Sequence, residues 1–295
     1  MKRIGIIIKR KRLNSYENTA FRKEAGKLGI NLDFIFIEDV SVKVTNEGVK
    51  LYYLSQTFND YDFIFNRLGS GITNKESCIV DAISCVYKVY NNGSCAQLLK
   101  DKFRTSLILQ QHNISVIPTM INEKNIKLDT INKLMEYPLV HKSNSGSIGK
   151  GIYKIDNQEQ LNQMMEFSDL IAQDYFYLLQ DFVDYKPGED IRVIMFKDKV
   201  VGAMKRHSDG EDFRTNFSIY QQATPFSVDD KLLKLCQQVM KTLPVDIAGI
   251  DLLETKDGYV VCEVNSAPGF MGLDSVSNKN IANKLIYEGY KLLED

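Results

Sequence analysis

Hydrophobic residues recur along the chain in two patterns, short β-branched runs and segments with helical spacing. Residues 4–8 (IGIII) form a short apolar run closed by charged residues, which is typical of a buried strand. Residues 18–29 carry apolar side chains at helical spacing and end at Gly29, a common helix stop. Further strands are predicted at 32–37 and 63–65. Strands alternating with helices predict a small parallel α/β unit over roughly the first ninety residues.

The pattern that follows Asn91-Asn92-Gly93, a strong turn signal, predicts two further units. Helices are expected at 98–112, 129–136, 229–243 and 281–293. Strands are expected at 115–119, 138–142, 153–155, 178–183, 190–196, 200–204, 247–253 and 259–264. We therefore predict an α/β protein with domains at 1–93, 94–180 and 181–295.

Composition and charge narrow the class of protein. Of the 295 residues, 44% are hydrophobic and 25% charged, as in an ordinary globular protein. The 37 basic and 38 acidic residues nearly cancel, which argues against nucleic acid as a partner, and the basic run 9–12 is interpreted as a solvated loop. The five cysteines form no C-x-x-C pair, which favours reduced thiols. No segment approaches the ~18 apolar residues of a membrane span, and run 4–8 is too short for a signal peptide. We expect a cytoplasmic protein.

A glycine-rich segment at 143–151 (SNSGSIGKG) lies between two predicted strands. Glycines such as Gly146 and Gly149 let main-chain N–H groups approach an anion closely, which suits polyphosphate. The segment lacks the spacing of a P-loop or of a dinucleotide fingerprint, and a plain hairpin loop is the alternative. Lys142 at its base favours phosphate binding, because an ammonium group complements phosphate charge.

Three oxygen-bearing side chains lie on two neighbouring predicted strands. Asp251 interrupts the apolar run AGIDLL, and Glu263 and Asn265 share one face of the next strand. A buried acid is costly unless it is paired or binds a cation. Hard oxygen ligands suit Mg²⁺ shared with substrate phosphates, so metal binding is favoured over the alternative of solvent-facing acids.

Basic residues lie between these two segments, namely Arg192, the run Lys205-Arg206-His207, and Arg214. Arginines that face a metal and phosphate site can stabilise transferring phosphoryl charge and bind carboxylates. Surface charge is the alternative for members of this group.

From about Asn91 to Asp274 the chain resembles the ATP-grasp superfamily, and specifically its RimK-type ligases, which join glutamate or another amino acid to a carboxylate. The matching segments are KDKFRT at 100–105, PLVHK at 138–142 with its glycine segment, LQDFV at 179–183, DIR at 190–192, DFRTN at 212–216, AGID at 248–251 and EVNSAPG at 263–269. NRLG at 66–69 also resembles the N-terminal domain of that family. The resemblance implies an α/β ATP-grasp fold, with an N-terminal Rossmann-like pre-ATP-grasp domain, a central domain and a C-terminal α+β domain.

Matched residue by residue, the resemblance implies a site for ATP and two Mg²⁺ ions, with Mn²⁺ as the alternative metal. The residues expected to bind ATP are Lys102, Lys142, Gly146 and Gly149 at the phosphates, Asp181, Phe182 and Val183 at the adenine, Asp190 at the ribose, and Arg214, Thr215 and Asn216 at the phosphates. The expected metal ligands are Asp251, Glu263 and Asn265. Arg206 and Arg214 are the expected catalytic residues.

The implied activity is that of an ADP-forming ligase, in which the γ-phosphate passes to a carboxylate and an amine then displaces phosphate to leave an amide. The substrates would be an amino acid and the carboxylate of a metabolite, a peptide or a protein tail; the oligomeric state, a homo-oligomer included, stays open. Asp181 stands where the family usually has Glu, Lys205 and His207 replace an acid and an arginine, and 217–222 replaces a His-Arg-Gly-Gly-like segment. A peptide-tailoring or dipeptide ligase using an amino acid other than L-glutamate is therefore one alternative. A nucleotide-binding regulatory protein without turnover is another.

Overall fold

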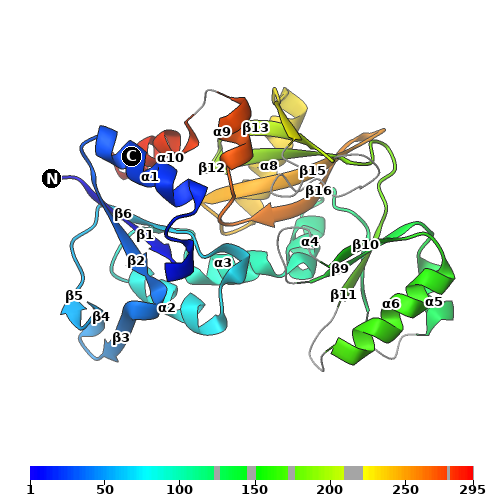
Figure 1. Cartoon of the computed structure of the whole chain (residues 1–295), viewed down its shortest axis with the longest axis horizontal. Helices are drawn as coiled ribbons and strands as arrows, with labels where there is room; N and C mark the ends of the chain where they lie inside the picture. The colour runs from blue at the N-terminus through cyan, green and yellow to red at the C-terminus, as the bar shows by residue number, and fades with distance from the viewer. Residues whose placement is uncertain (123–126, 145–150, 172–176, 209–221, 278–279, 295) are drawn as a thin grey trace.

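The computed structural model describes residues 1–122, 127–144, 151–171, 177–208, 222–277 and 280–294. Figure 1 shows the N-terminal unit on the left, the C-terminal sheet at the upper right and the central unit at the lower right. Both chain termini lie on the left, beside the N-terminal unit. None of the described helices is both long enough and apolar enough to cross a membrane.

The N-terminal unit is built on a four-stranded parallel sheet in the order β2-β1-β6-β7. Its strands are β1 (Arg3–Ile8), β2 (Asn31–Phe36), β6 (Phe63–Asn66) and β7 (Val89–Tyr90), and its helices are α1 (Tyr16–Lys27) and α2 (Asn74–Ser84). The strands predicted at 4–8, 32–37 and 63–65 are confirmed, and the helix predicted at 18–29 starts and ends slightly earlier. The pattern missed α2, although Thr73 and Glu76 form a reciprocal capping box at its start.

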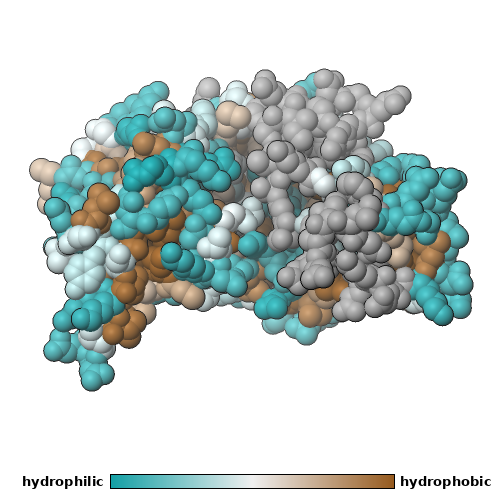
Figure 2. Space-filling view, turned by 60° about the horizontal axis from the view of Figure 1, so that its bottom comes forward, coloured by the Kyte–Doolittle hydropathy of each residue, from teal (hydrophilic) through white to brown (hydrophobic). Residues whose placement is uncertain are grey.

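A separate antiparallel sheet extends from the N-terminal unit. Its strands are β3 (Val40–Thr45), β4 (Gly48–Tyr53) and β5 (Gln56–Thr57). On the face in Figure 2, hydrophilic residues predominate among the coloured residues and the hydrophobic ones form small separate groups.

The central unit is an antiparallel sheet in the order β10-β9-β11-β8, packed against two helices. Its elements are β8 (Thr119–Asn122), α5 (Leu128–Leu134), β9 (Leu139–Ser143), β10 (Ile152–Ile155), α6 (Gln158–Ile171) and β11 (Tyr177–Asp181). Antiparallel pairing of β9 with β10 confirms the predicted hairpin around the glycine-rich segment. Residues 145–150 of that segment lie outside the described residues.

The C-terminal unit is a five-stranded antiparallel sheet in the order β14-β13-β12-β15-β16. Its strands are β12 (Glu189–Phe196), β13 (Lys199–His207), β14 (Gln222–Pro225), β15 (Ile247–Thr255) and β16 (Gly258–Asn265). The helices that follow or interrupt them are α8 (Asp230–Thr242), α9 (Met271–Val276) and α10 (Ile281–Glu294). The predicted mainly-β character of this region is thereby confirmed.

Two predictions between the units are wrong. The single helix expected at 98–112 is two helices, α3 (Gly93–Lys100) and α4 (Lys102–Gln111). Asp101 separates them, because its backbone is extended and its side chain accepts a hydrogen bond from the Arg104 N–H at 2.9 Å, capping α4. The strand expected at 115–119 begins only at Thr119, and Val116 forms a single isolated bridge with Val261.

Buried apolar side chains form one core that joins the first and last parts of the chain. Residues of β1 and β6 pack in one cluster with residues of β12, β13 and α10. Tyr90 at the end of β7 donates from its hydroxyl to the Gly289 carbonyl in α10 at 2.7 Å. The central unit has its own cluster, with Leu139 and Leu179 on its strands and Ile131 and Leu161 on its helices. The division into domains at 93 and 180 stays a prediction.

Candidate active site

A cavity of about 140 Å³, here called the inner cavity, lies between the central sheet and the C-terminal sheet. Nine of the predicted site residues line it: Lys102, Lys142, Asp181, Phe182, Val183, Asp190, Arg206, Asp251 and Glu263. These residues come from α4, β9, the end of β11, and β12, β13, β15 and β16, so the fold brings together positions that are far apart in the sequence. Gly146, Gly149, Arg214, Thr215 and Asn216 lie outside the described residues.

Two buried lysines occupy one wall of the inner cavity. Lys142 is on β9, and Lys102 is the first residue of α4. Asn144 joins the two elements, because its side-chain oxygen accepts from the Phe103 N–H at 2.9 Å and its carbonyl from the Lys102 N–H at 3.3 Å. Burial lowers the pKa of the Lys142 ammonium, against the opposing charge of Glu263. This wall therefore favours the binding of a polyanion.

The predicted metal ligands converge on neighbouring strands. In the β15–β16 pair Asp251 lies directly opposite Glu263, and the Asn265 side chain donates to Asp251 at 3.3 Å. The register shifts just after Asp251, so that Cys262 is an extra residue in β16 and lines the inner cavity beside Glu263. The cavity therefore also contains a thiol, whose pKa burial raises to about 11.

Two acids, Asp190 and Asp251, and two arginines, Arg192 and Arg206, form ion pairs across the neighbouring strands β12, β13 and β15, here called the charge ladder. Arg192 on β12 donates two hydrogen bonds to Asp251, at 2.7 and 2.6 Å. Arg206 on β13 donates to Asp190 from Nε at 2.6 Å and also from Nη2, and lies 3.2 Å from Asp251. Burial alone would raise the pKa of Asp251, but the two arginines outweigh it and hold the pKa below its ordinary value. The same acids hold the pKa of the buried Arg206 above its ordinary value.

The donor set suits a hard divalent cation. Two carboxylates and one amide oxygen are the ligand types that Mg²⁺ prefers. Within the described ranges, no group of three or more His, Cys, Asp and Glu side chains could hold a metal ion, so the amide of Asn265 is needed to complete a third ligand. Lys102 lies 3.6 Å from Glu263 and so partly neutralises the acid pair.

Backbone packing positions Asn265 and the turn that follows it. A Cβ atom at Gly249 would lie 2.6 Å from the Pro268 Cβ, so the absence of a side chain lets this turn fold back onto β15. Arg67, from the N-terminal unit, donates to the Pro268 carbonyl at 3.0 Å. The NRLG segment is therefore attached to the turn that follows the metal-ligand strand.

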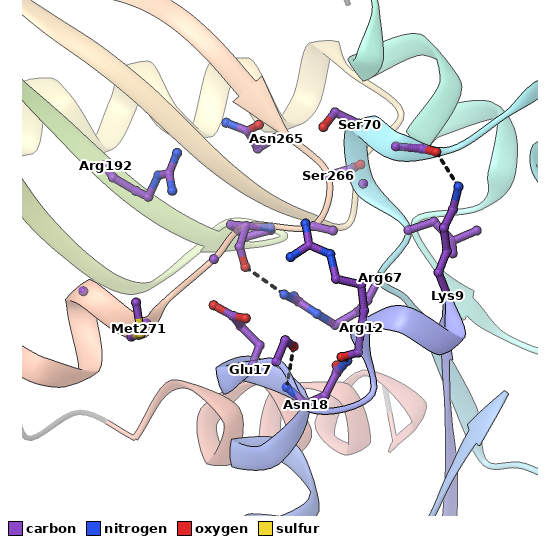
Figure 3. A pocket seen from close by; sticks show the side chains of 18 of the residues that line it. Lys9, Arg12, Glu17, Asn18, Arg67, Ser70, Arg192, Asn265, Ser266 and Met271 are labelled. Atoms are coloured by element: carbon purple, nitrogen blue, oxygen red, sulfur yellow. Dashed lines mark hydrogen bonds between the residues drawn. The ribbon is translucent and has the colours of Figure 1, made fainter. Parts of the chain in front are cut away.

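A second, larger cavity of about 520 Å³, here called the cationic pocket, lies between the N-terminal unit and the C-terminal sheet. Its lining includes six basic residues, Lys9, Lys11, Arg12, Arg67, Arg192 and Arg206, and one acid, Glu17. Figure 3 shows Arg12 and Arg67 reaching into the pocket from the side opposite to Arg192. Arg206 lines both this pocket and the inner cavity. A ligand in either space can therefore contact the same guanidinium group.

Sequence reasoning missed several residues of the two cavities. The interpretation of run 9–12 as a solvated loop agrees with the exposure of Arg10, Lys11 and Arg12, but it did not anticipate that Lys9, Lys11 and Arg12 line the cationic pocket. Arg192 was among the basic residues singled out in the sequence, and it lines the cationic pocket. Gln180 also lines the inner cavity, where it is buried and donates to the Thr119 hydroxyl at 2.6 Å.

The fold is that of ATP-grasp proteins. It resembles the solved ATP-grasp ligase PsnB, in its complex with a phosphomimetic variant of the minimal precursor, Mg and ADP, with a TM-score of 0.73 at 15% identity over 98% of each chain. A likeness at this identity concerns the fold alone.

The family follows from the sequence comparisons. A family model for the RimK-like ATP-grasp domain matches residues 99–288, and the chain belongs to this family. It is 30% identical to a probable alpha-L-glutamate ligase of Shewanella loihica, over 97% of this chain and 94% of that protein. It is 32% identical to the alpha-aminoadipate–LysW ligase LysX of Saccharolobus solfataricus, over 81% of this chain and 93% of that protein. The resemblance inferred from the sequence is confirmed, and the protein is an ATP-dependent carboxylate–amine ligase, an enzyme that forms an amide bond.

Proposed function

We propose that this ligase phosphorylates a carboxylate held in the cationic pocket, using ATP bound in the inner cavity, and that the amine of an amino acid then attacks the acylphosphate. The observation that carries the proposal is the contact of Arg206 with both spaces, beside Asp251. Oxygen of the carboxylate bonds to the γ-phosphorus as the bond to ADP breaks. The amine then forms the amide bond, loses a proton and releases phosphate.

The predicted site residues of the inner cavity have the following roles in this scheme. Lys102 and Lys142 bind the ATP phosphates, and the backbone at 181–183 borders the adenine, with Asp190 at the ribose. Arg206 binds the carboxylate and the transferring phosphoryl group, whose negative charge it offsets. For Arg214, Thr215 and Asn216, outside the described residues, the same phosphate-binding role is proposed from the sequence resemblance.

Asp251, Glu263 and Asn265 would hold Mg²⁺, two ions in the full proposal, with Mn²⁺ as the alternative. When bound, the metal neutralises the phosphate oxygens so that an anionic carboxylate can approach them. Arg192 holds Asp251 through two hydrogen bonds and so fixes the direction in which this carboxylate faces.

L-glutamate is the first amino acid to test as the amine substrate, because the relative from Shewanella loihica is named as a probable alpha-L-glutamate ligase. The acceptor carboxylate belongs to a metabolite, a peptide or a protein tail. All five cysteines are free in the structure, which supports the proposed cytoplasmic location.

The test measures ADP release for a panel of amino acids combined with carboxylate acceptors, followed by mass spectrometry of the product. The expected product has the mass of the two substrates less one water, and hydroxylamine should trap the acylphosphate as a hydroxamate. Glu263→Gln should lower the rate of ADP release by about 10³-fold, whereas Glu288→Gln, on α10 and outside the lining of both cavities, should leave it unchanged. ADP release without amide product and without hydroxamate, across the panel, would refute the proposal.

A further inference from the structure

A cysteine lies inside the inner cavity, among the residues expected to bind ATP. Cys262 is the extra residue of the β-bulge in β16, and its partly exposed side chain lines the cavity next to Glu263. The other cysteines line neither cavity; they are the exposed Cys78 and Cys85 and the buried Cys95 and Cys236. A reagent that enters the inner cavity therefore meets a single thiol.

The same cavity contains a buried ammonium group. Lys142 is only 4% exposed and lines the cavity, and it forms neither an ion pair nor a side-chain hydrogen bond with any residue in the described part of the chain. Lys142 and the Cys262 thiol are close enough to interact electrostatically. A buried cation without a partner is costly, so Lys142 indicates an anionic ligand beside the thiol.

The acids that line the cavity do not cancel this charge. Asp190 and Asp251 are neutralised within the charge ladder. Glu189 lies 3.1 Å from Lys205, and Glu263 lies 3.6 Å from Lys102.

Asp181 is the one acid of this lining without a described cation, and it is remote from Lys142. It lies opposite Leu139, which is three residues from Lys142 along β9, or about 10 Å at ~3.3 Å per residue. The space between Lys142 and Cys262 is therefore suited to an added negative charge.

The inner cavity also has room for a small group on the sulfur. Its volume is about 140 Å³, against about 30 Å³ per molecule in liquid water, so a substituent of about five non-hydrogen atoms fits. Such a group on Cys262 would occupy the space between Lys142 and Glu263. Under the proposed function this is the space of the ATP phosphates.

We infer that Cys262 is a site of reversible S-thiolation, at which an anionic low-molecular-weight disulfide transfers one of its halves to the protein while Lys142 binds the anionic group. The Cys262 sulfur attacks one sulfur of the disulfide, so that a new S–S bond forms and the original one breaks. The other half leaves as a thiol and takes up the proton of Cys262. The disulfide is the oxidant, and a second thiol from solution reverses the reaction by the same exchange.

The charge of the disulfide decides the selectivity. A partly exposed thiol within a cavity meets fewer reagent molecules than an exposed one such as Cys78. A disulfide that Lys142 holds beside Cys262 has a higher effective concentration there. Because the modified side chain fills the space of the phosphates, thiolation and ATP binding exclude each other. This last consequence rests on the proposed function.

The experiment follows the thiolation of each cysteine of the full chain by mass spectrometry of its peptides. The probes are dithiodiglycolate, a dianion, and dithiodiglycolamide, a neutral disulfide of the same shape. Cys78 is the internal reference, because it is exposed, lies outside both cavities and reports the ordinary reactivity of each probe. Lys142→Met is the test variant, and Lys133→Met, at an exposed lysine outside both cavities, is the matched control.

The measured quantity is the rate with the dianion divided by the rate with the amide. In the wild type this ratio should be about ten-fold higher at Cys262 than at Cys78. Lys142→Met should lose most of that preference, and Lys133→Met should keep it. Equal ratios at the two cysteines, no modification of Cys262 once Cys78 has reacted fully, or an unchanged preference in a folded Lys142→Met protein would overturn the inference. The wild-type ratio decides by itself if Lys142→Met does not fold.

A non-hydrolysable ATP analogue with Mg²⁺ tests the shared cavity. The analogue should slow the thiolation of Cys262 and leave that of Cys78 unchanged. In calorimetry, thiolated protein should bind the analogue at least about ten-fold more weakly, and dithiothreitol should restore the affinity. Cys262→Ser should have the same affinity before and after treatment, which assigns the loss to this thiol. Equal affinity of the thiolated and the reduced wild type would contradict the inference.

This design separates the inference from the proposed function. Charge-selective thiolation of Cys262 in a protein that does not bind the analogue would sustain the inference and refute the proposed nucleotide site. Binding of the analogue without any slowing of Cys262 thiolation would sustain the nucleotide site and overturn the inference.

Discussion

Replacing Asn91 tests how the N-terminal unit holds the metal-ligand strands in place. Asn91 follows β7, is buried, and has a positive φ of 63°. Its side-chain oxygen accepts from the N–H groups of Asp246 and Ile247, at 2.8 and 3.1 Å. Its side-chain nitrogen donates to the carbonyls of Ile247 and Ser266, each at 2.6 Å. One side chain thereby joins the start of β15 to the residue just after β16.

The expected magnitude follows from these four hydrogen bonds. Asn91→Ala leaves four main-chain groups without their side-chain partner. Each buried group that stays unpaired lowers the free energy of unfolding by about 1–3 kcal/mol. The positive φ adds about 1 kcal/mol, because alanine disfavours that conformation. At the lower end of each range, the free energy of unfolding should fall by about 5 kcal/mol, a large fraction of the roughly 5–15 kcal/mol typical of a folded protein.

The assay is urea denaturation of the full chain, with two comparison variants. Asn91→Gly loses the same hydrogen bonds but tolerates the positive φ, so it should be about 1 kcal/mol more stable than Asn91→Ala. Asn92→Ala removes only the cap of α3, where the Asn92 oxygen accepts from the Cys95 N–H at 2.8 Å, and should cost about 1 kcal/mol. If Asn91→Ala costs no more than Asn92→Ala, the proposed junction does not support the strands.

Further predictions concern the inner cavity and the central sheet. Glu263→Gln should lower the rate of ADP formation by about 10³-fold without lowering the melting temperature, and a near-normal rate would exclude Glu263 as a metal ligand. Lys142→Ala should weaken ATP binding by at least about ten-fold in calorimetry; equal affinity would contradict its role at the phosphates. Arg206→Met should cost about 3–5 kcal/mol of unfolding free energy, because it takes from the buried Asp190 the guanidinium that donates two hydrogen bonds to it and from Asp251 one of its two arginines; a smaller loss would mean that these charges are not tightly coupled. Burial lowers the pKa of His141 from 6.5 to about 4, so the unfolded chain binds a proton that the folded protein does not between these pH values. Stability should therefore fall as the pH drops through this window, by up to about 3 kcal/mol, and His141→Phe should flatten that profile in denaturation curves measured from pH 7 to pH 4.

Local sequence signals were enough for most elements of the fold. Residues 4–8 and 281–293 show their strand and helix through apolar spacing alone, and the structure agrees. The break at Asp101 was also legible, since an Asp before a helical run is a cap signal that the longer apolar pattern concealed. The capping box before α2 is a second signal of that kind.

Asp251, Glu263 and Lys142 could be identified from the local sequence, whereas Lys102, Asp181 and Asp190 were expected only from the family resemblance. An acid within an apolar strand, such as Asp251, must be buried, and the free-energy cost of burying its charge requires a cationic partner or a metal ion. The sequence could not show that Arg192 is the partner of Asp251, because this pairing depends on the register of β12 against β15. The thiol of Cys262 was hidden for a similar reason, since a β-bulge overrides simple alternation.

The cationic pocket could not be predicted at all from local pattern. Long stretches of sequence separate Lys11 and Arg12 from Arg67 and from the turn after Asn265, and each segment by itself resembles an ordinary exposed polar segment. Only the packing of the N-terminal unit on the C-terminal sheet places them around one space.

The position of Arg206 between the two cavities has a consequence for the thermodynamics of binding. If ATP changes the affinity for the acceptor by some factor, the acceptor must change the affinity for ATP by the same factor. A guanidinium that contacts both ligands, and that is shared with Asp190 and Asp251, is a physical source for such a factor. Under the proposed function, a substitution of Arg206 that changes this factor therefore changes it equally for ATP and for the acceptor.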